Sequence, residues 1–105
     1  MDGPVISADR DERKARLVLG GELDMSARFQ AEQALDKLLA TPVEQLVVDL
    51  GEVTFVDSTG MGLVLDVNDR ARSEGFKLRI LRGSDEVQRV FELAGVADAL
   101  PFAPS

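Results

Sequence analysis

Residues 46–62 read LVVDLGEVTFVDSTGMG, and this stretch decides the fold class. Its first five residues form a compact run rich in β-branched side chains, which is typical of a central strand covered on both faces. Residues 51–54 predict a turn, and residues 57–60 (Asp-Ser-Thr-Gly) predict the start of a helix that extends to about Glu74. Gly75 is placed to end that helix with left-handed backbone angles. A buried strand that leads into a helix indicates an α/β domain.

The sequence before this stretch predicts a hairpin and a first helix. Residues 5–9 and 15–23 are expected to be strands, with the charged run 9–16 as their connection. Ser26 is placed to cap a helix that runs to about Ala40. The apolar positions of that helix follow the i, i+3, i+4, i+7 spacing of one buried stripe and are Ala31, Ala34, Leu35 and Leu38.

The sequence after the stretch predicts one more strand and one more helix. Residues 77–82 are expected to be a strand, and Ser84 is placed to cap a third helix. The apolar stripe of that helix is expected to be Val87, Val90, Phe91 and Ala94. Residues 100–103 fit either a short final strand or an apolar cover. The order of elements predicts one α/β domain over residues 1–105, with a mixed central sheet and an antiparallel N-terminal hairpin.

Composition excludes several classes of function. The 105 residues carry 12 Lys and Arg against 19 Asp and Glu, a net charge of −7, so we expect no direct contact with nucleic acid. The chain has no Cys and no His, which rules out thiolate nucleophiles, Cys-ligated zinc and an imidazole base. Nothing approaches the roughly 20 apolar residues that cross a bilayer, so we expect no membrane partner and a cytoplasmic location.

The start of the second helix is the segment of greatest functional interest. Gly60 and Gly62 both fall near its first turn, where each costs about 0.5–1 kcal/mol relative to Ala. Two glycines there indicate a close approach of the backbone, by a neighbouring element or by an outside partner. One interpretation is a tight turn with Asp57 or Ser58 as a simple helix cap. The other is a hydroxyl displayed at a helix N-terminus, where a phosphate is bound or is attached to Ser58.

The second helix also has a wide apolar arc. Met61, Val64, Val67 and Ala71 cluster on one face, with Leu63 and Leu65 at its margins. The arc spans about 200°, against about 100° for the stripe that a surface helix needs. We expect most of it to be core and part of it to be a docking surface beside the hydroxyl. Asp66 and Asp69 are expected to form a charged rim on the opposite side.

Four short motifs carry a resemblance to a known family. They are Gly21-Glu22-Leu23-Asp24, Val48-Asp49-Leu50, the run from Phe55 to Gly62, and Phe91-Glu92-Leu93-Ala94-Gly95-Val96. In order and spacing they cover essentially the whole chain. Together they resemble the STAS-domain anti-sigma factor antagonists, whose fold is a small mixed sheet with helices packed on one side.

The resemblance implies a partner and a modification. The expected partner is an anti-sigma factor that is also a serine kinase, and it phosphorylates Ser58, with Thr59 as a minor alternative. The phosphorylated form releases the partner, and a PPM-type serine phosphatase restores the unmodified form. The partner-binding residues implied on this chain are Asp24, Asp57, Ser58, Thr59, Gly60, Met61, Gly62 and Leu65.

Two alternatives remain open at this point. The first is a STAS docking subunit of a transport or stress-signalling complex, which uses the same loop without a phosphoswitch. The second is a carboxylate site for Mg²⁺ made of Asp24, Asp49 and Asp57, because Mg²⁺ prefers oxygen ligands. The main interpretation needs no catalytic residue, no cofactor and no metal, since the kinase and the phosphatase supply the chemistry.

Overall fold

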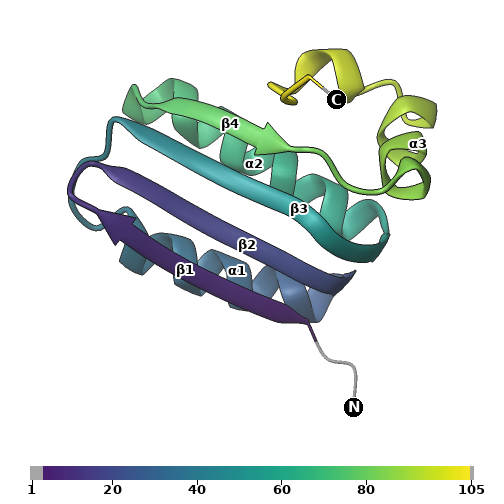
Figure 1. Cartoon of the computed structure of the whole chain (residues 1–105), viewed down its shortest axis with the longest axis horizontal. Helices are drawn as coiled ribbons and strands as arrows, with labels where there is room; N and C mark the ends of the chain where they lie inside the picture. The colour runs from purple at the N-terminus through teal and green to yellow at the C-terminus, as the bar shows by residue number, and fades with distance from the viewer. Residues whose placement is uncertain (1–3, 105) are drawn as a thin grey trace.

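The strands and helices follow one another in the predicted order. The computed structural model describes residues 4–104, so residues 1–3 and 105 of the expected domain lie outside the described residues. The elements are β1 (Val5–Asp11), β2 (Lys14–Leu23), α1 (Met25–Leu38), β3 (Gln45–Val56), α2 (Ser58–Glu74), β4 (Lys77–Leu81), α3 (Asp85–Leu93) and the 3₁₀ turn η1 (Ala97–Ala99). The sheet has the order β1-β2-β3-β4, with β1 antiparallel to β2 and the other pairs parallel (Figure 1). The predicted mixed sheet with its N-terminal hairpin is confirmed.

The two long helices pack on the same face of the sheet. Figure 1 shows α1 and α2 behind the sheet, with α3 beyond the carboxyl ends of β3 and β4. Leu46, Val48 and Leu50 are buried on the helix side of β3, whereas Val47 and Asp49 on the opposite side are only half-buried. The expectation that this strand is covered on both faces is therefore wrong. Antiparallel pairing with β1 at one edge allows a sheet whose second face meets solvent.

Two expected connections are strand in the structure. The hairpin turn consists of only Glu12 and Arg13, and Glu12 has a positive φ of 55°. Residues 51–54 continue β3 because its pairing with β2 runs on to Val56. The pairing of β2 with β3 shifts register on either side of Gly21, whose φ is 74°. Such shifts are typical of β-bulges.

The first helix begins earlier than predicted, and the third buries a different side chain. Asp24 caps α1, and Ser26 is an exposed residue of its first turn. Ser84 caps α3 as expected, through a hydrogen bond of 3.3 Å from the N–H of Val87. In α3, however, Gln88 is buried and Ala94 is exposed. The Gln88 side chain is satisfied because its Oε1 accepts a hydrogen bond of 2.8 Å from the backbone of the preceding loop.

The last residues form an apolar cover with a single strand-like bridge. Phe102 pairs with Ile80 through an isolated parallel bridge, and Leu100 is buried. The ring of Phe102 meets the buried ring of Phe91 edge-on, with centroids 5.3 Å apart. This contact ties the C-terminal segment to α3, and the bridge to Ile80 covers part of the open edge of β4.

Candidate functional site

Two strand-to-helix turns lie side by side at one end of the molecule. Leu23 ends β2 and Val56 ends β3, and these two residues are register partners. The next residue of each chain segment is an aspartate whose carboxylate accepts a hydrogen bond from the backbone N–H three residues later, at 3.1 Å for Asp24 and 2.9 Å for Asp57. Both aspartates are N-caps, which satisfy one of the free N–H groups of a helix start. The N-termini of α1 and α2 therefore share one edge of the sheet.

Ser58 is the exposed hydroxyl residue at the start of α2. It is the first residue of the helix, directly after the Asp57 cap. Thr59 is half-buried, and its carbonyl oxygen accepts a hydrogen bond of 3.3 Å from Nη1 of Arg28. Of the two hydroxyl residues, Ser58 is thus the more accessible to a partner.

Gly60 is a requirement of packing within the chain. A Cβ atom at this position would overlap the carbonyl oxygen of Leu23 and would lie 2.8 Å from the carbonyl carbon. The residue is buried, so it supports the turn from the inside instead of presenting a surface. The sequence left open whether a neighbouring element or an outside partner approaches this glycine. The structure shows that the end of β2, at Leu23, does so.

The other predicted contact residues on α2 are half-buried. A Cβ atom at Gly62 would lie 2.6 Å from Nη1 of Arg28, so this glycine makes room for a side chain of α1. Met61 and Leu65 pack partly against the core. Asp66 pairs with Arg28 on the side that faces α1, and it does not form a free rim with Asp69.

The structure adds apolar residues that the sequence interpretation missed. Met25 and Phe29 are 72% and 62% exposed and lie four residues apart at the start of α1. Phe55, close to the end of β3, is also exposed. Met25 and Phe29 fall outside the predicted apolar stripe of α1. Apolar residues off the buried stripe are the signal in the sequence that could have identified this exposed surface. The exposed pair Met25 and Phe29 at the start of α1 is of a kind found on protein-binding surfaces.

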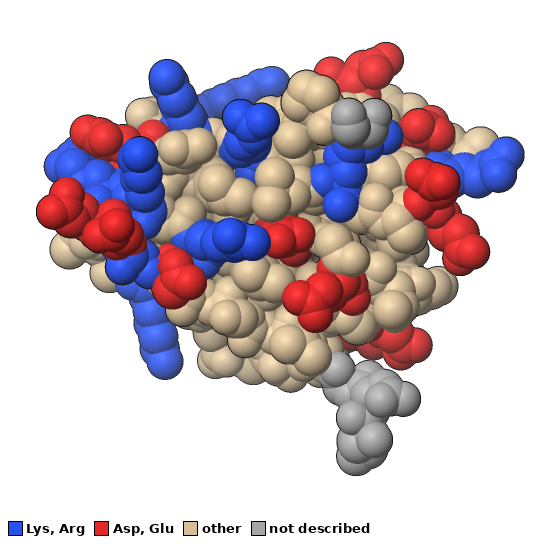
Figure 2. All heavy atoms as spheres, in the orientation of Figure 1, with Lys and Arg blue, Asp and Glu red and all other residues tan. Residues whose placement is uncertain are grey.

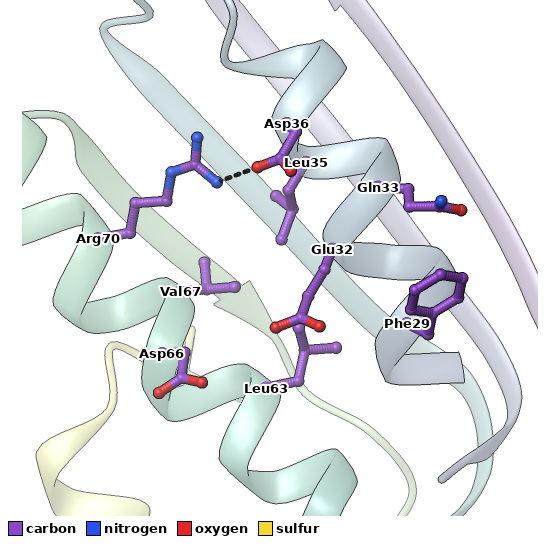
Figure 3. Close-up of a pocket in the computed structure, with 9 residues that line it drawn as sticks. All are labelled: Phe29, Glu32, Gln33, Leu35, Asp36, Leu63, Asp66, Val67 and Arg70. Carbon is purple, nitrogen blue, oxygen red and sulfur yellow. Dashed lines mark hydrogen bonds and ion pairs between the residues drawn. The ribbon is translucent and has the colours of Figure 1, made fainter. Parts of the chain in front are cut away.

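A groove of about 370 Å³ separates α1 from α2 (Figure 3). Leu35, Leu63 and Val67 form its apolar wall, and Phe29 lies at one end. The polar residues that line it are Glu32, Gln33, Asp36, Asp66 and Arg70. An apolar groove with a charged rim can receive side chains of a protein partner.

Arg70 anchors the far end of this groove. Its guanidinium lies 3.0 Å from Asp36 on α1 and 2.6 Å from Glu74 on α2 (Figure 3 draws the first pair). Partial burial alone would lower the pKa of Arg70, but hydrogen bonds and charge from Glu74 and Asp36 outweigh it and raise the pKa. Arg70 therefore links α1 to α2 through charged hydrogen bonds to one carboxylate on each helix.

The three aspartates proposed as a metal site do not meet. Asp49 accepts a hydrogen bond of 2.8 Å from Arg16, and its other oxygen accepts one of 2.8 Å from the N–H of Gly51. It lies on the open face of the sheet, away from the two capping aspartates at the strand ends. Within residues 4–104 the structure contains no cluster of three or more potential metal ligands. The prediction that these three aspartates form a Mg²⁺ site is therefore wrong.

No helix in the described part of the chain is long and apolar enough to cross a membrane.

Comparisons with known proteins agree with this architecture. Residues 6–101 match the family model described as "Mlab, STAS domain". The anti-sigma-B factor antagonist of Staphylococcus aureus strain NCTC 8325 is 32% identical over 82 residues, which are 78% of this chain and 76% of that protein.

Solved structures show the same fold. An anti-sigma factor antagonist from Mycobacterium paratuberculosis superposes with a TM-score of 0.84 at 22% identity, over 99% of this chain and 88% of that one. The antagonist SpoIIAA in its unphosphorylated form superposes with a TM-score of 0.78 at 23% identity, over 96% and 90%. SpoIIAA of Bacillus has also been solved in its phosphorylated form, which superposes with a TM-score of 0.68 at 22% identity, over 96% and 93%.

Proposed function

The chain belongs to the STAS-domain anti-sigma factor antagonist family, and from this premise we propose that it binds a cognate anti-sigma factor while Ser58 is unmodified. In this proposal the anti-sigma factor is also a serine kinase that phosphorylates Ser58. Binding frees the sigma factor, and phosphorylation ends the binding until a PPM-type serine phosphatase removes the phosphate. The protein acts in the cytoplasm as a binding partner and not as an enzyme.

The observation that carries the proposal is the exposed position of Ser58 beside the aspartate that caps α2. A serine that accepts a phosphoryl group needs access to the kinase and no catalytic base of its own, because the kinase positions the base. Ser58 has that access at the first residue of α2, and Asp57 holds the turn around it through its cap. The fold is shared with SpoIIAA, which exists in a phosphorylated form.

The arrangement also explains why a phosphate would act on the partner and not on the fold. Phosphorylation adds about −1.5 to −2 charges directly beside the Asp57 carboxylate. The N–H of Gly60 already donates to Asp57, so the phosphate does not replace the cap. The added charge instead changes the surface that the partner meets at Ser58, and a shift of about 3–5 kcal/mol would change occupancy by two to three decades or more.

A pull-down with unmodified and Ser58-phosphorylated protein, read by mass spectrometry, identifies the partner. Calorimetric titration of that partner with wild type, Ser58→Ala and Ser58→Asp then tests the switch. We expect Ser58→Ala to retain binding and Ser58→Asp to weaken it, with Ser73→Asp, at an exposed site in the last turn of α2, as the control. Equal affinity of all these proteins would remove Ser58 from the switch.

Incubation with ATP and the captured partner separates the switch from a docking role. Intact mass followed by peptide mapping is expected to show one phosphate, on Ser58 and not on Thr59. If the partner binds tightly but adds no phosphate, the protein is a docking subunit that uses the same surface without modification.

A further inference from the structure

Arg28 joins α1 to the start of α2 along the row that contains Ser58. Its Nη1 donates a hydrogen bond of 3.3 Å to the carbonyl oxygen of Thr59, and its Nη2 pairs with the carboxylate of Asp66. Ser58, Gly62 and Asp66 are four residues apart in succession, so they stack in one row on the surface of α2. Arg28 lies along this row and reaches its middle and its far end.

The missing side chain at Gly62 leaves room for the guanidinium one helical turn from Ser58. Nη1 of Arg28 lies 2.6 Å from the point where a Cβ atom of Gly62 would be. Cβ atoms four residues apart on a helix are about 5–6 Å apart, so Nη1 lies within about 9 Å of the Ser58 Cβ. The phosphate group projects beyond that Cβ, and the arginine side chain has several rotatable bonds through which its guanidinium can change position.

Besides the carbonyl oxygen of Thr59, the partners of Arg28 are two carboxylates that are about half-exposed. Glu32 is 3.4 Å from Nε of Arg28, and the side chains of Glu32 and Asp66 are 49% and 57% exposed. Pairs of such exposure contribute little to stability, because water and salt screen them. A phosphoserine dianion offers more charge and three acceptor oxygens, which match the planar guanidinium in a bidentate pair.

We propose that Arg28 binds the phosphate of phosphorylated Ser58 and leaves Asp66 and Glu32 when it does so. The inference rests on the proposed function only in that Ser58 carries a phosphate. The guanidinium offsets the repulsion between the phosphate and Asp57, so the modified protein keeps its fold.

The move of Arg28 extends the effect of phosphorylation to the groove between α1 and α2. Glu32 and Asp66 both line this groove and lie toward the end that holds Phe29 (Figure 3). Without Arg28 their charges are no longer neutralised there. Phosphorylation therefore makes both the start of α2 and the mouth of the groove more negative, over a larger area than Ser58 alone.

The test uses phosphoserine placed at position 58 during translation, so that no kinase is involved. A ³¹P NMR titration measures the second pKa of the phosphate, which is about 6 when no cation is near. We expect wild type to show a pKa at least about 0.5 unit below that of Arg28→Ala, because a nearby cation favours the dianion. Equal pKa values in the two proteins would overturn the proposal.

Further variants separate the direct pair from other charge effects. Arg28→Ala also unmasks Asp66, so Arg28→Ala with Asp66→Asn is compared with Asp66→Asn alone, and the difference is expected to persist. Asp66→Asn alone is expected to lower the phosphate pKa further, because it removes a competitor for Arg28. Arg72→Ala, at an exposed site in the last turn of α2, is expected to leave the pKa unchanged.

A second readout reports on Arg28 itself. The ¹⁵Nε–H resonance of Arg28 is expected to shift between the unmodified and the phosphoserine protein, and an unchanged resonance would contradict the move. These results do not depend on partner binding. If no kinase modifies Ser58, the proposed function is wrong. The titration still tests separately whether Arg28 binds the phosphate of phosphoserine 58.

Discussion

The turn from β2 into α1 and the turn from β3 into α2 have the same architecture but differ at the three residues after the capping aspartate, and two of these differences matter most. Each ends a parallel strand, continues with a capping aspartate and starts a helix on the same face of the sheet. The residue after the aspartate is Met25 in the first turn and Ser58 in the second. The aspartate cap is thus common to both turns and does not mark one of them as the functional turn. The hydroxyl at Ser58 distinguishes the turn that we propose to be modified.

The third residue after the cap differs as well. It is Ala27 in α1 and Gly60 in α2, and both are buried. Ala27 has room for its methyl group, whereas a methyl group at Gly60 would overlap the backbone of Leu23. The turn with the serine is therefore packed directly against the end of the neighbouring strand.

The largest expected effect is on stability, from Gly60→Ala. The new methyl group meets backbone that cannot move aside, and we expect a loss of about 2–4 kcal/mol in the free energy of unfolding, measured by urea titration. The matched variant Ala27→Gly in the other turn is expected to cost about 1–2 kcal/mol, from helix propensity and from the loss of a buried methyl group. A Gly60→Ala protein as stable as wild type would show that the two turns are equally permissive.

The second prediction compares a negative charge in each turn. Ser58→Glu is expected to weaken binding of the captured partner about 30-fold, or about 2 kcal/mol, by calorimetry. Ser26→Glu is expected to weaken it less, because its charge is added next to the exposed Met25 and not beside the Asp57 carboxylate. Neither variant is expected to lose stability, because an acid in the first turn of a helix is favourable. Similar losses of affinity would mean that the partner does not distinguish the turns.

The third prediction concerns the caps themselves. Asp24→Ala and Asp57→Ala are each expected to lower the free energy of unfolding by about 1 kcal/mol, because each leaves a helix N–H without its acceptor. Asp24→Asn and Asp57→Asn keep the acceptor and are expected to remain within about 0.5 kcal/mol of wild type. Urea unfolding measures all four variants. A cost at only one turn would break the equivalence of the two caps.

The smallest effect is expected at Gly62. Its missing Cβ is close only to the end of the Arg28 side chain, which can move away. Gly62→Ala gains up to about 1 kcal/mol of helix propensity and loses the exposed pair between Arg28 and Asp66, so we expect a net change within about 1 kcal/mol. A loss as large as that of Gly60→Ala would mean that Arg28 is held rigidly, and it would also count against the mobility that our inference requires.

The elements that were predicted well are those whose signals are local. The stripe of α1 with Ala31, Leu35 and Leu38, the glycine end of α2 at Gly75 and the Ser84 cap are each encoded within a few neighbouring residues. The failures occurred where two local signals competed. Ser26 and Asp24 both qualify as caps, and the carboxylate at Asp24 is the one that follows the end of its strand. Residues 51–54 contain a glycine that suggests a turn, but pairing with β2 extends the strand through them.

The sequence by itself determined the order of strands and helices, the acidic balance, and the Asp-Ser pair at the start of α2. These depend on periodicity, caps and composition, which act over a few residues. Only the tertiary structure decided that Gly60 packs against Leu23, that one face of the sheet stays open, and that Arg28 reaches the Ser58 row of α2. The open face is turned to the viewer in Figure 2, where Lys and Arg side chains gather over the half in which β2, β3 and β4 begin. Each of these features joins residues more than 30 positions apart in the chain, and no local pattern specifies which distant backbone or side chain will be the neighbour.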